Sequence, residues 1–314
     1  MNSDIVSNCG KTFLQGIKDS ISFHLVISYF YSSPHIRRRA LQSSLLNGGL
    51  FCGSIIFLQY IWIPLFEYVW FLCGFHEHTI HFMIQWMSFC FDICWFYPLY
   101  AISFLLSSMW YQDIATSALT MQNSLTYKSF HTPANPVNIP SFSFKQWISS
   151  ISEDLYRLLI GILFMIQGIL WSYCPWIGTF VFSAHVCWLY AWYAFEYKWG
   201  GQAWTFAQRI DYFECHWCYF AGFGCPLTIV TMCLSGFLGA SLYAFLFPIV
   251  LLLAIMAQPR PVYFKSSSSV NTRVQNMNCP SPILFRLPLF SSCVIVMNAA
   301  LGRFRKTCMK NIHV

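Results

Sequence analysis

The sequence predicts an all-α integral membrane protein with about six apolar helices, some of which could be hairpins that penetrate only half of the bilayer. Hydrophobic residues fill 57% of the 314 positions and charged residues only 9%, whereas about a quarter of the residues in ordinary soluble domains are charged. So few charges cannot cover a soluble surface. Phe (31) and Trp (13) are frequent, as expected where many helix ends meet the membrane–water boundary.

Residues 1–45 are polar and basic, and we expect them to lie on the cytosolic side. Within residues 11–21, four apolar side chains recur at helical spacing, namely Phe13, Leu14, Ile17 and Ile21. This spacing predicts a short amphipathic helix on the membrane surface, with a frayed terminus as the alternative. Residues 1–20 lack the apolar core of a secretory signal peptide, so we expect the first membrane helix to be an uncleaved anchor.

The net charge of +7 is concentrated at the two ends of the apolar region. Arg37-Arg38-Arg39 precedes the first apolar run, and residues 302–314 form a basic tail. Basic residues beside membrane helices orient those helices and contact anionic lipid on the cytosolic side. The sequence therefore predicts two cytosolic termini and a membrane-lipid partner. It does not predict a nucleic-acid partner, because no polar segment is long enough to form a folded basic surface.

Residues 46–301 should form the membrane domain. Its apolar runs are Leu45–Phe75, Phe82–Trp110, Leu155–Cys174, Trp176–Phe195, Leu227–Ala257 and Ile283–Leu301. About 20 residues suffice to cross the hydrocarbon core. Pro64 predicts a kink in the first run. Only Pro175 separates the third run from the fourth, so these two should form an antiparallel hairpin that either spans the bilayer or dips into it.

Residues 116–150 read as a proline-containing linker with little fixed structure. In the fifth run, the small residues Ser235, Gly236, Gly239 and Ala240 have a spacing that allows close contact between helices.

The central segment, residues 189–226, concentrates charges among aromatic residues: Glu196, Lys198, Arg209, Asp211 and Glu214. Such a mixture is typical of the membrane–water interface. Because a lone charge near lipid needs a partner, we expect Glu196 to pair with Lys198 and Arg209 with Glu214, without acid–base chemistry. Gly222-Phe223-Gly224 before Pro226 predicts a tight turn that precedes the next helix.

Two groups of residues suggest metal binding, and both favour a simpler interpretation. Cys215, His216 and Cys218 have zinc-ligand chemistry, but no second ligand pair lies at a suitable spacing. His76, Glu77, His78 and His81 fit a solvated loop. Asp92, an acid inside the second apolar run, is a candidate functional group that could instead face a polar partner such as Gln59. We predict no enzyme, no cofactor and no metal site.

Several stretches resemble the etoposide-induced protein 2.4 family of endoplasmic-reticulum membrane proteins. They are Lys11–Ile21, Asn47-Gly48-Gly49, Trp110–Ala115, Ile166-Gln167-Gly168, Phe195–Trp199, Gln208-Arg209-Ile210, Trp217 and Tyr219–Leu227. They follow the order of the family and cover most of the chain. The candidate functional or structural residues are Gln112, Asp113, Glu196, Lys198, Arg209, Glu214, Trp217, Gly222, Gly224 and Pro226.

The resemblance implies a multi-pass protein of the endoplasmic-reticulum membrane that acts in autophagosome maturation, with links to growth suppression and apoptosis. It implies other endoplasmic-reticulum or autophagy proteins as partners and leaves a homo-oligomer open. It also implies distant kinship with bacterial CysZ sulfate permeases, which combine two full transmembrane helices with partly penetrating hairpins. A sulfate-like anion transporter or channel is therefore the second hypothesis, with Arg209 and the Gly222-Phe223-Gly224 turn as candidate anion contacts.

Overall fold

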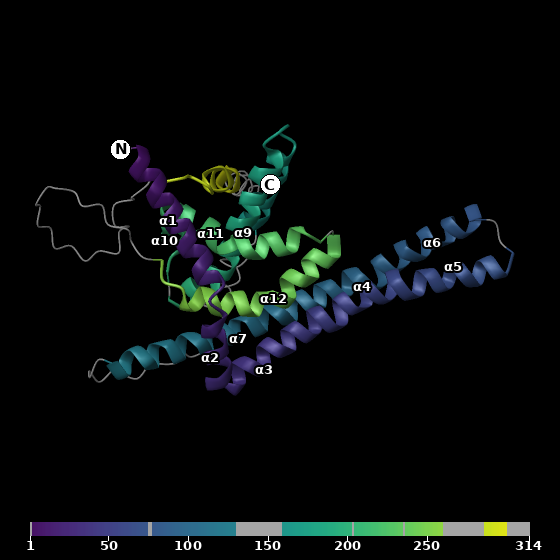
Figure 1. The fold of residues 1–314 in the computed structure, drawn as a ribbon, viewed down its shortest axis with the longest axis horizontal. Coiled ribbons are helices and arrows are strands. Elements are labelled where there is room, and N and C mark those ends of the chain that lie inside the picture. The colour runs from purple at the N-terminus through teal and green to yellow at the C-terminus, as the bar shows by residue number, and fades with distance from the viewer. Residues whose placement is uncertain are drawn as a thin grey trace, which may run out of the picture.

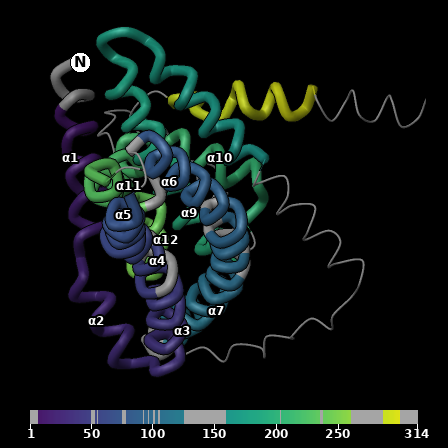
Figure 2. Tube along the Cα trace, turned by 90° about the vertical axis from the view of Figure 1, so that its right-hand side faces the viewer, coloured from purple at the N-terminus to yellow at the C-terminus, as the bar shows by residue number. Residues whose placement is uncertain are grey.

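The computed structural model describes residues 2–74, 77–129, 159–202, 204–234, 236–259 and 286–299, and every regular element in these ranges is a helix. The all-α prediction is thereby confirmed. The molecule has a body and an arm, and we define the arm as residues 53–74 and 77–102. Figure 1 shows the arm leaving the body as two long helices that lie next to each other. Figure 2 looks along the arm toward the body.

The described parts of the body and arm are built from helices. In chain order they are α1 (Asn2–Ser20), α2 (Phe23–Ser32), α3 (Pro34–Ser44), η1 (Leu45–Cys52), α4 (Gly53–Phe57), η2 (Leu58–Trp62), α5 (Ile63–Leu72), α6 (Glu77–Phe91), η3 (Asp92–Phe96), α7 (Tyr97–Ser129), Leu159–Ser172, α9 (Gly178–Gly201), α10 (Phe206–Cys215), α11 (Trp217–Met232), α12 (Gly236–Met256) and 291–299. The η elements are π-helical.

The helix predicted within residues 11–21 forms as part of α1, which packs along α11. A Cβ atom added to Gly16 would overlap the carbonyl oxygen of Tyr219, and one added to Gly222 would overlap that of Phe13. Leu14 and Ile21, expected on the apolar face, are exposed. The face that meets α11 is selected by small side chains because the two backbones approach closely, and periodicity of large apolar residues does not report this.

Each branch of the arm is a continuous helix that passes through a π-helical stretch. Pro64 and Pro98 lie in the first turns of α5 and α7, directly after η2 and η3. A proline lacks an N–H and its ring crowds the carbonyl four residues earlier, and a local π-helical adjustment accommodates both effects. At Pro64, where a kink was predicted, the helix changes from the π-helical η2 to α5 and the branch is not interrupted.

The arm buries almost none of its own side chains. Among its described side chains, only Leu58 and Ile80 are buried. Its exposed large apolar residues are Ile56, Phe57, Tyr60, Ile61, Trp62, Leu65, Tyr68, Val69, Phe71, Leu72, Phe82, Met83, Trp86, Phe89, Ile93, Trp95, Tyr97 and Ile102. Exposed apolar surface on this scale marks a contact with lipid or with another protein.

The predicted linker at residues 116–150 is wrong in its first part, because α7 continues to Ser129. Ala118 and Leu119 are buried in the body, while the hydroxyls of Thr116 and Thr120 donate to carbonyls one turn earlier. Polar composition here reflects the exposed face of a helix, and the first proline comes only at Pro133. Residues 130–150 lie outside the described residues.

The hairpin predicted around Pro175 is confirmed. Residues 173–177 form a turn in which Trp176 has a left-handed φ of 70°. On the two sides of this turn, the rings of Phe164 and His185 lie 5.1 Å apart, and a Cβ atom on Gly168 would lie 3.1 Å from that of His185.

The fifth apolar run is two helices, α11 and α12, and not one. The chain leaves helical conformation at Cys233 and Leu234 and returns on itself. A Cβ atom on Gly239 would lie 2.8 Å from the carbonyl oxygen of Thr231. This glycine of the predicted small-residue pattern therefore closes a hairpin within the chain.

The sixth run also differs from the prediction. Residues 286–290 are not helical, and the described helix covers only 291–299.

By length and hydropathy, one uninterrupted helix among the described residues, Leu238–Met256, could cross a membrane. The helices Leu159–Ser172 and Trp217–Met232 are apolar but shorter. A single long apolar helix does not identify a membrane protein, because the core helix of a soluble protein has the same properties. The exposed surface of the arm is the stronger observation.

Candidate functional site

The charges of the central segment gather where the end of α9, the short helix α10, the end of α12 and residues 286–290 meet. We call this region the junction and define it by Glu196, Lys198, Arg209, Glu214 and Arg286. Aromatic side chains pack beneath it. Trp192, Trp199 and Phe213 are buried there, with the rings of Trp192 and Phe213 5.3 Å apart. This burial fixes the positions from which the charged side chains project.

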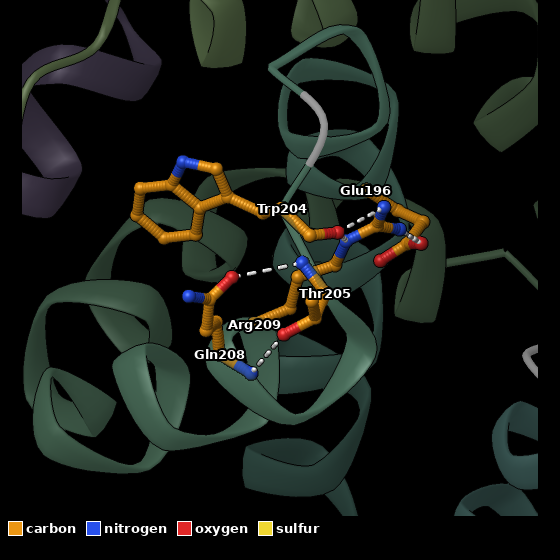
Figure 3. A network of polar contacts seen from close by, with 5 residues as sticks. All are labelled: Glu196, Trp204, Thr205, Gln208 and Arg209. Atoms are coloured by element: carbon orange, nitrogen blue, oxygen red, sulfur yellow. Dashed lines mark hydrogen bonds and ion pairs between the residues drawn. The ribbon is translucent and has the colours of Figure 1, made fainter. Parts of the chain in front are cut away.

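A capping box starts α10 and positions Arg209 (Figure 3). The Gln208 N–H donates to Thr205 Oγ1 at 3.4 Å, and the Thr205 N–H donates to Gln208 Oε1 at 2.9 Å. These two bonds satisfy two N–H groups that the first turn of a helix leaves without intrahelical partners. The start of α10 is thereby fixed one turn before Arg209.

The Arg209 guanidinium is buried, and each of its three nitrogens makes a hydrogen bond. Nε and Nη2 donate to the carbonyl oxygen of Trp204 at 3.0 and 2.7 Å, and Nη1 pairs with Glu196 Oε1. The exposed fractions of the two side chains are 5% and 12%. Arg209 thus joins the ends of α9 and α10, and its partner is Glu196. The predicted pairing of Arg209 with Glu214 is wrong.

Lys198, predicted to pair with Glu196, instead caps a different helix. Its buried ammonium donates to the carbonyl oxygens of Ala254, at 3.3 Å, and Ala257. These carbonyls lie at the C-terminus of α12, where backbone oxygens lack intrahelical partners and the helix dipole favours a cation. The Glu196–Lys198 pair was predicted because lone charges near lipid need partners, but the partners of Lys198 come from the end of α12, a distant part of the chain.

Glu214 is completely buried, and its carboxylate binds residues 286–290. Its carboxylate accepts from Arg286 Nε at 2.8 Å and from the Phe290 N–H at 3.0 Å. Arg286 also pairs with Asp211 at 2.7 Å. The hydrogen bond to Glu214 raises the pKa of Arg286, so the guanidinium stays charged. The Leu287 N–H donates to the Glu214 carbonyl oxygen at 3.3 Å, so Glu214 supplies partners to two backbone N–H groups of this non-helical stretch.

Gly222 and Gly224 lie inside α11, so the predicted turn at Gly222-Phe223-Gly224 is wrong. A Cβ atom on Gly224 would overlap the carbonyl oxygen of Cys187 on α9, as one on Gly222 would overlap α1. Pro226 lies within the same helix. The glycines are required by close approach of α11 to two neighbouring helices and not by a turn.

The remaining aromatic and thiol residues of this segment pack at the α10–α11 boundary. The Trp217 carbonyl accepts from Trp188 Nε1 at 2.9 Å, and His216, between the two helices, donates from Nδ1 to the Tyr212 carbonyl at 2.9 Å. Cys218 is buried and Cys215 half-buried. Among the described residues, no group of three or more His, Cys, Asp and Glu side chains is arranged to hold a metal ion.

The remaining candidate residues lie elsewhere. Asp113 pairs with Arg39 at 3.1 Å and ties α7 to α3. The neighbouring Gln112 is exposed, and its carbonyl accepts from Thr116. Asp92 is the first residue of η3, and its side chain lies outside the described part of the structure. The structure therefore does not gather all ten candidate residues into one site.

Sequence reasoning missed a buried polar cluster at the base of the arm. Asn47 Nδ2 donates to the Ser43 carbonyl at 2.8 Å and to Ser107 Oγ at 3.0 Å, while Asn47 Oδ1 accepts from Ser103 Oγ at 2.5 Å. Ser241 Oγ donates to the Asn47 carbonyl at 2.9 Å. The sequence features that could have predicted this cluster are the Asn47 amide inside an apolar run and the pair Ser103 and Ser107, one helical turn apart.

Every charged side chain of the junction contacts another charge or a backbone group. The arrangement is therefore suited to holding helix ends in place, and Arg209 already binds Glu196 and the carbonyl oxygen of Trp204.

The comparisons with known proteins point to one family. A sequence model of the family described as "Sulfate transporter CysZ/Etoposide-induced protein 2.4" matches residues 22–255. A "Protein EI24 homolog" of Arabidopsis thaliana is 28% identical over 317 aligned positions, covering 93% of this chain and 94% of the relative.

Two further relatives match shorter parts of the chain. A homologue of the same name in Dictyostelium discoideum is 28% identical over 78% of this chain and 73% of its own. "Ectopic P granules protein 4" of Caenorhabditis elegans is 32% identical over 48% of this chain and 44% of its own. No solved structure matches the chain. The family model covers most of the chain and the first relative nearly all of it, so the chain belongs to the sulfate transporter CysZ/etoposide-induced protein 2.4 family.

Proposed function

We propose that this chain is a multi-pass membrane protein of the endoplasmic reticulum that supports autophagosome maturation through protein and lipid contacts and not through catalysis. Family membership supports the autophagy assignment, together with the links to growth suppression and apoptosis that the resemblance implies. The arm is the observation that carries the membrane assignment. Its exposed aromatic and aliphatic side chains would be unstable in water and match the apolar interior of a bilayer.

The dimensions of the arm fit this location. The helical part of the first branch, from Gly53 to Leu72, is about 30 Å long at the rise of an α-helix, which matches the roughly 30 Å of the hydrocarbon core. Its described side chains include one carboxylate, Glu67, near the tip of the branch. We assign the two branches as full crossings.

Each of the two hairpins of the body pairs a long helix, α9 or α12, with a shorter one, and we assign both hairpins as partial crossings because of the shorter helix. Helix α11 is about 24 Å long, less than the hydrocarbon thickness, and the described part of the helix Leu159–Ser172 is about 21 Å long. Tyr173, Trp176 and Phe180 at the tip of one hairpin are almost wholly exposed, and Ile229 is exposed near the tip of the other. The charged junction lies at the opposite ends of these helices, as expected if the tips dip into lipid from the cytosolic side.

The membrane assignment is tested by placing charges on the arm. The variant Tyr60→Lys/Tyr68→Lys/Trp86→Lys should lose resistance to carbonate extraction, because each lysine in mid-membrane costs about 2.5–3.5 kcal/mol. The matched control is Thr116→Lys/Thr120→Lys/Ser124→Lys, which places the same charges on exposed positions of α7 in the body. Full retention of the arm variant in the membrane fraction would contradict the assignment.

The autophagy assignment is tested by rescue in cells depleted of this chain. Immature autophagosomes should accumulate on depletion, and the α7 control variant should restore their maturation at the endoplasmic reticulum while the arm variant does not. Unchanged autophagic flux after complete depletion would refute the role.

Anion transport is the second candidate, and membership of a family that includes a sulfate transporter is the observation that favours it. The contacts first considered for an anion are occupied, since Arg209 is paired and Gly222 lies within α11. The buried amide and hydroxyls around Asn47 are the alternative polar groups for such a path.

Reconstituted protein in liposomes distinguishes the two candidates. Sulfate or chloride flux that Asn47→Leu reduces, in protein that remains folded, would make this chain a permease and its autophagy role a consequence of ion movement. Absence of flux from folded protein would leave the contact-based role.

A further inference from the structure

The corner between α2 and α3 forms a hollow next to the base of the arm. Ser33 connects the two helices and caps α3, with its Oγ accepting from the Ile36 N–H at 3.4 Å. The hollow has a volume of about 420 Å³ and is lined by Ile27, Phe30, Tyr31 and Arg37. This volume lies within the range of roughly 300–1,000 Å³ that small-ligand sites occupy.

The α2 side of the corner is apolar and faces outward. Helix α2 uses Val26 and Tyr29 to pack on the body. Ile27 and Tyr31, which line the hollow, remain 53% and 82% exposed, and Phe23 is 52% exposed at the start of the helix. Large apolar side chains grouped in this way fit a partner that is itself apolar at this position.

The α3 side of the corner is basic. Between Ile21 and Asn47 the sequence has three arginines and no acidic residue. Arg39 pairs with Asp113, whereas Arg37 and Arg38 are exposed. The nearest preceding acid in the sequence, Asp19 at the end of α1, accepts from the Tyr219 hydroxyl at 2.7 Å. Arg37 and Arg38 stand near the N-terminus of α3, where the helix dipole repels cations and so adds to the attraction of an anion.

We propose that this corner is a binding site for one anionic phospholipid. The headgroup phosphate pairs with Arg37 and Arg38, and an acyl chain covers Ile27 and Tyr31. The apolar half of the corner assigns the phosphate to a lipid, because a free phosphate ion would leave those side chains in water. The site rests on the proposed membrane location.

The position of the site gives it a mechanical role. Helix α3 continues without interruption through η1 into the arm, so a lipid held at the corner fixes the arm's base relative to the cytosolic leaflet. Arg39 contributes by tying α3 to α7, the other branch of the arm.

The test measures lipid retained by the full chain, purified in neutral detergent and offered equal amounts of phosphatidylserine and phosphatidylcholine, by native mass spectrometry. The wild-type chain should retain phosphatidylserine preferentially. Arg37→Gln/Arg38→Gln should reduce that preference about fivefold for each arginine removed. The matched control, Lys11→Gln/Lys18→Gln, removes the same charge from exposed positions on α1 and should keep the preference.

A second pair of variants tests the apolar half. Ile27→Ser should weaken retention of both lipids, whereas Leu14→Ser, an exposed leucine on α1, should not. Competition by inorganic phosphate alone, together with no effect of Ile27→Ser, would replace the lipid with a soluble anion and overturn the proposal. Equal losses in the arginine variant and the lysine control would reduce the binding to general electrostatics and also overturn it.

The experiments distinguish a failure of the proposed membrane location from a failure of the corner site. Wild-type protein that carbonate extracts from membranes would refute the proposed location, whatever lipid it retains in detergent. Carbonate-resistant protein whose Arg37→Gln/Arg38→Gln variant keeps the wild-type lipid preference would refute only the corner site.

Discussion

The junction and the arm are both rich in aromatic residues but use them in opposite ways. At the junction, Trp199 and Phe213 are buried, and each charge above them has a named partner. In the arm, Tyr60 and Trp86 face outward. The same composition therefore serves an interior in one region and an apolar surface in the other. The difference indicates that the junction is stabilised by the chain itself, while the arm depends on its surroundings.

The largest expected effect is at Arg209. Arg209→Ala leaves the Glu196 carboxylate buried without its guanidinium partner and should lower the free energy of unfolding by about 3–5 kcal/mol. The measurement is sodium dodecyl sulfate titration of protein held in a mild non-ionic detergent.

A double variant shows whether the charge pair itself is responsible. Adding Glu196→Gln to Arg209→Ala removes the buried charge and should recover part of the loss. If the double variant is as unstable as the sum of the two single variants, the pair is not coupled and the description of the junction is wrong.

The next effect is at the contact between α1 and α11. Gly222→Ala introduces a Cβ atom against the Phe13 carbonyl and should destabilise the protein by about 1–3 kcal/mol. Gly10→Ala is the matched control on α1, where a Cβ atom meets nothing within 4 Å. It should stabilise the helix by roughly 0.5–1 kcal/mol, so the two substitutions differ in sign. Equal effects would show that α1 does not pack closely on α11.

Local sequence patterns were sufficient to predict helices and one hairpin. The spacing of apolar residues and the position of Pro175 predicted the packing of Leu159–Ser172 against α9, and Gly168 beside His185 confirms it. The structural character of the charges was also predictable, because isolated charges among aromatic residues need partners. The identity of those partners was not, since Arg286 and the end of α12 lie far along the chain from Glu214 and Lys198.

Glycine was the least predictable feature of the candidate site. A turn and a close helix contact both require a residue without a Cβ atom, so Gly222 and Gly224 support either interpretation until the neighbouring helices are known. Residues 116–129 misled for a different reason. Their polar side chains suggested a linker, although Ala118 and Leu119, three and four residues after the buried Ala115, are buried in the body.

A smaller effect is expected at the cap of α10. Thr205→Ala removes the acceptor for the Gln208 N–H and should cost about 1 kcal/mol in the same titration. Thr205→Ser keeps the acceptor and serves as the control. A Thr205→Ser variant as unstable as Thr205→Ala would mean that the lost methyl group, and not the hydrogen bond, accounts for the effect.

The smallest effect is expected in the arm, where it tests the contrast between the two regions most directly. Trp86→Ala removes an exposed ring and should change the unfolding free energy in detergent by less than about 0.5 kcal/mol. The same substitution at buried Trp199 should cost about 3–5 kcal/mol. Because the two variants delete identical atoms, any difference between them reports the surroundings of the ring. A large loss from Trp86→Ala would show that the arm packs against the protein, and the argument that lipid covers it would then fail.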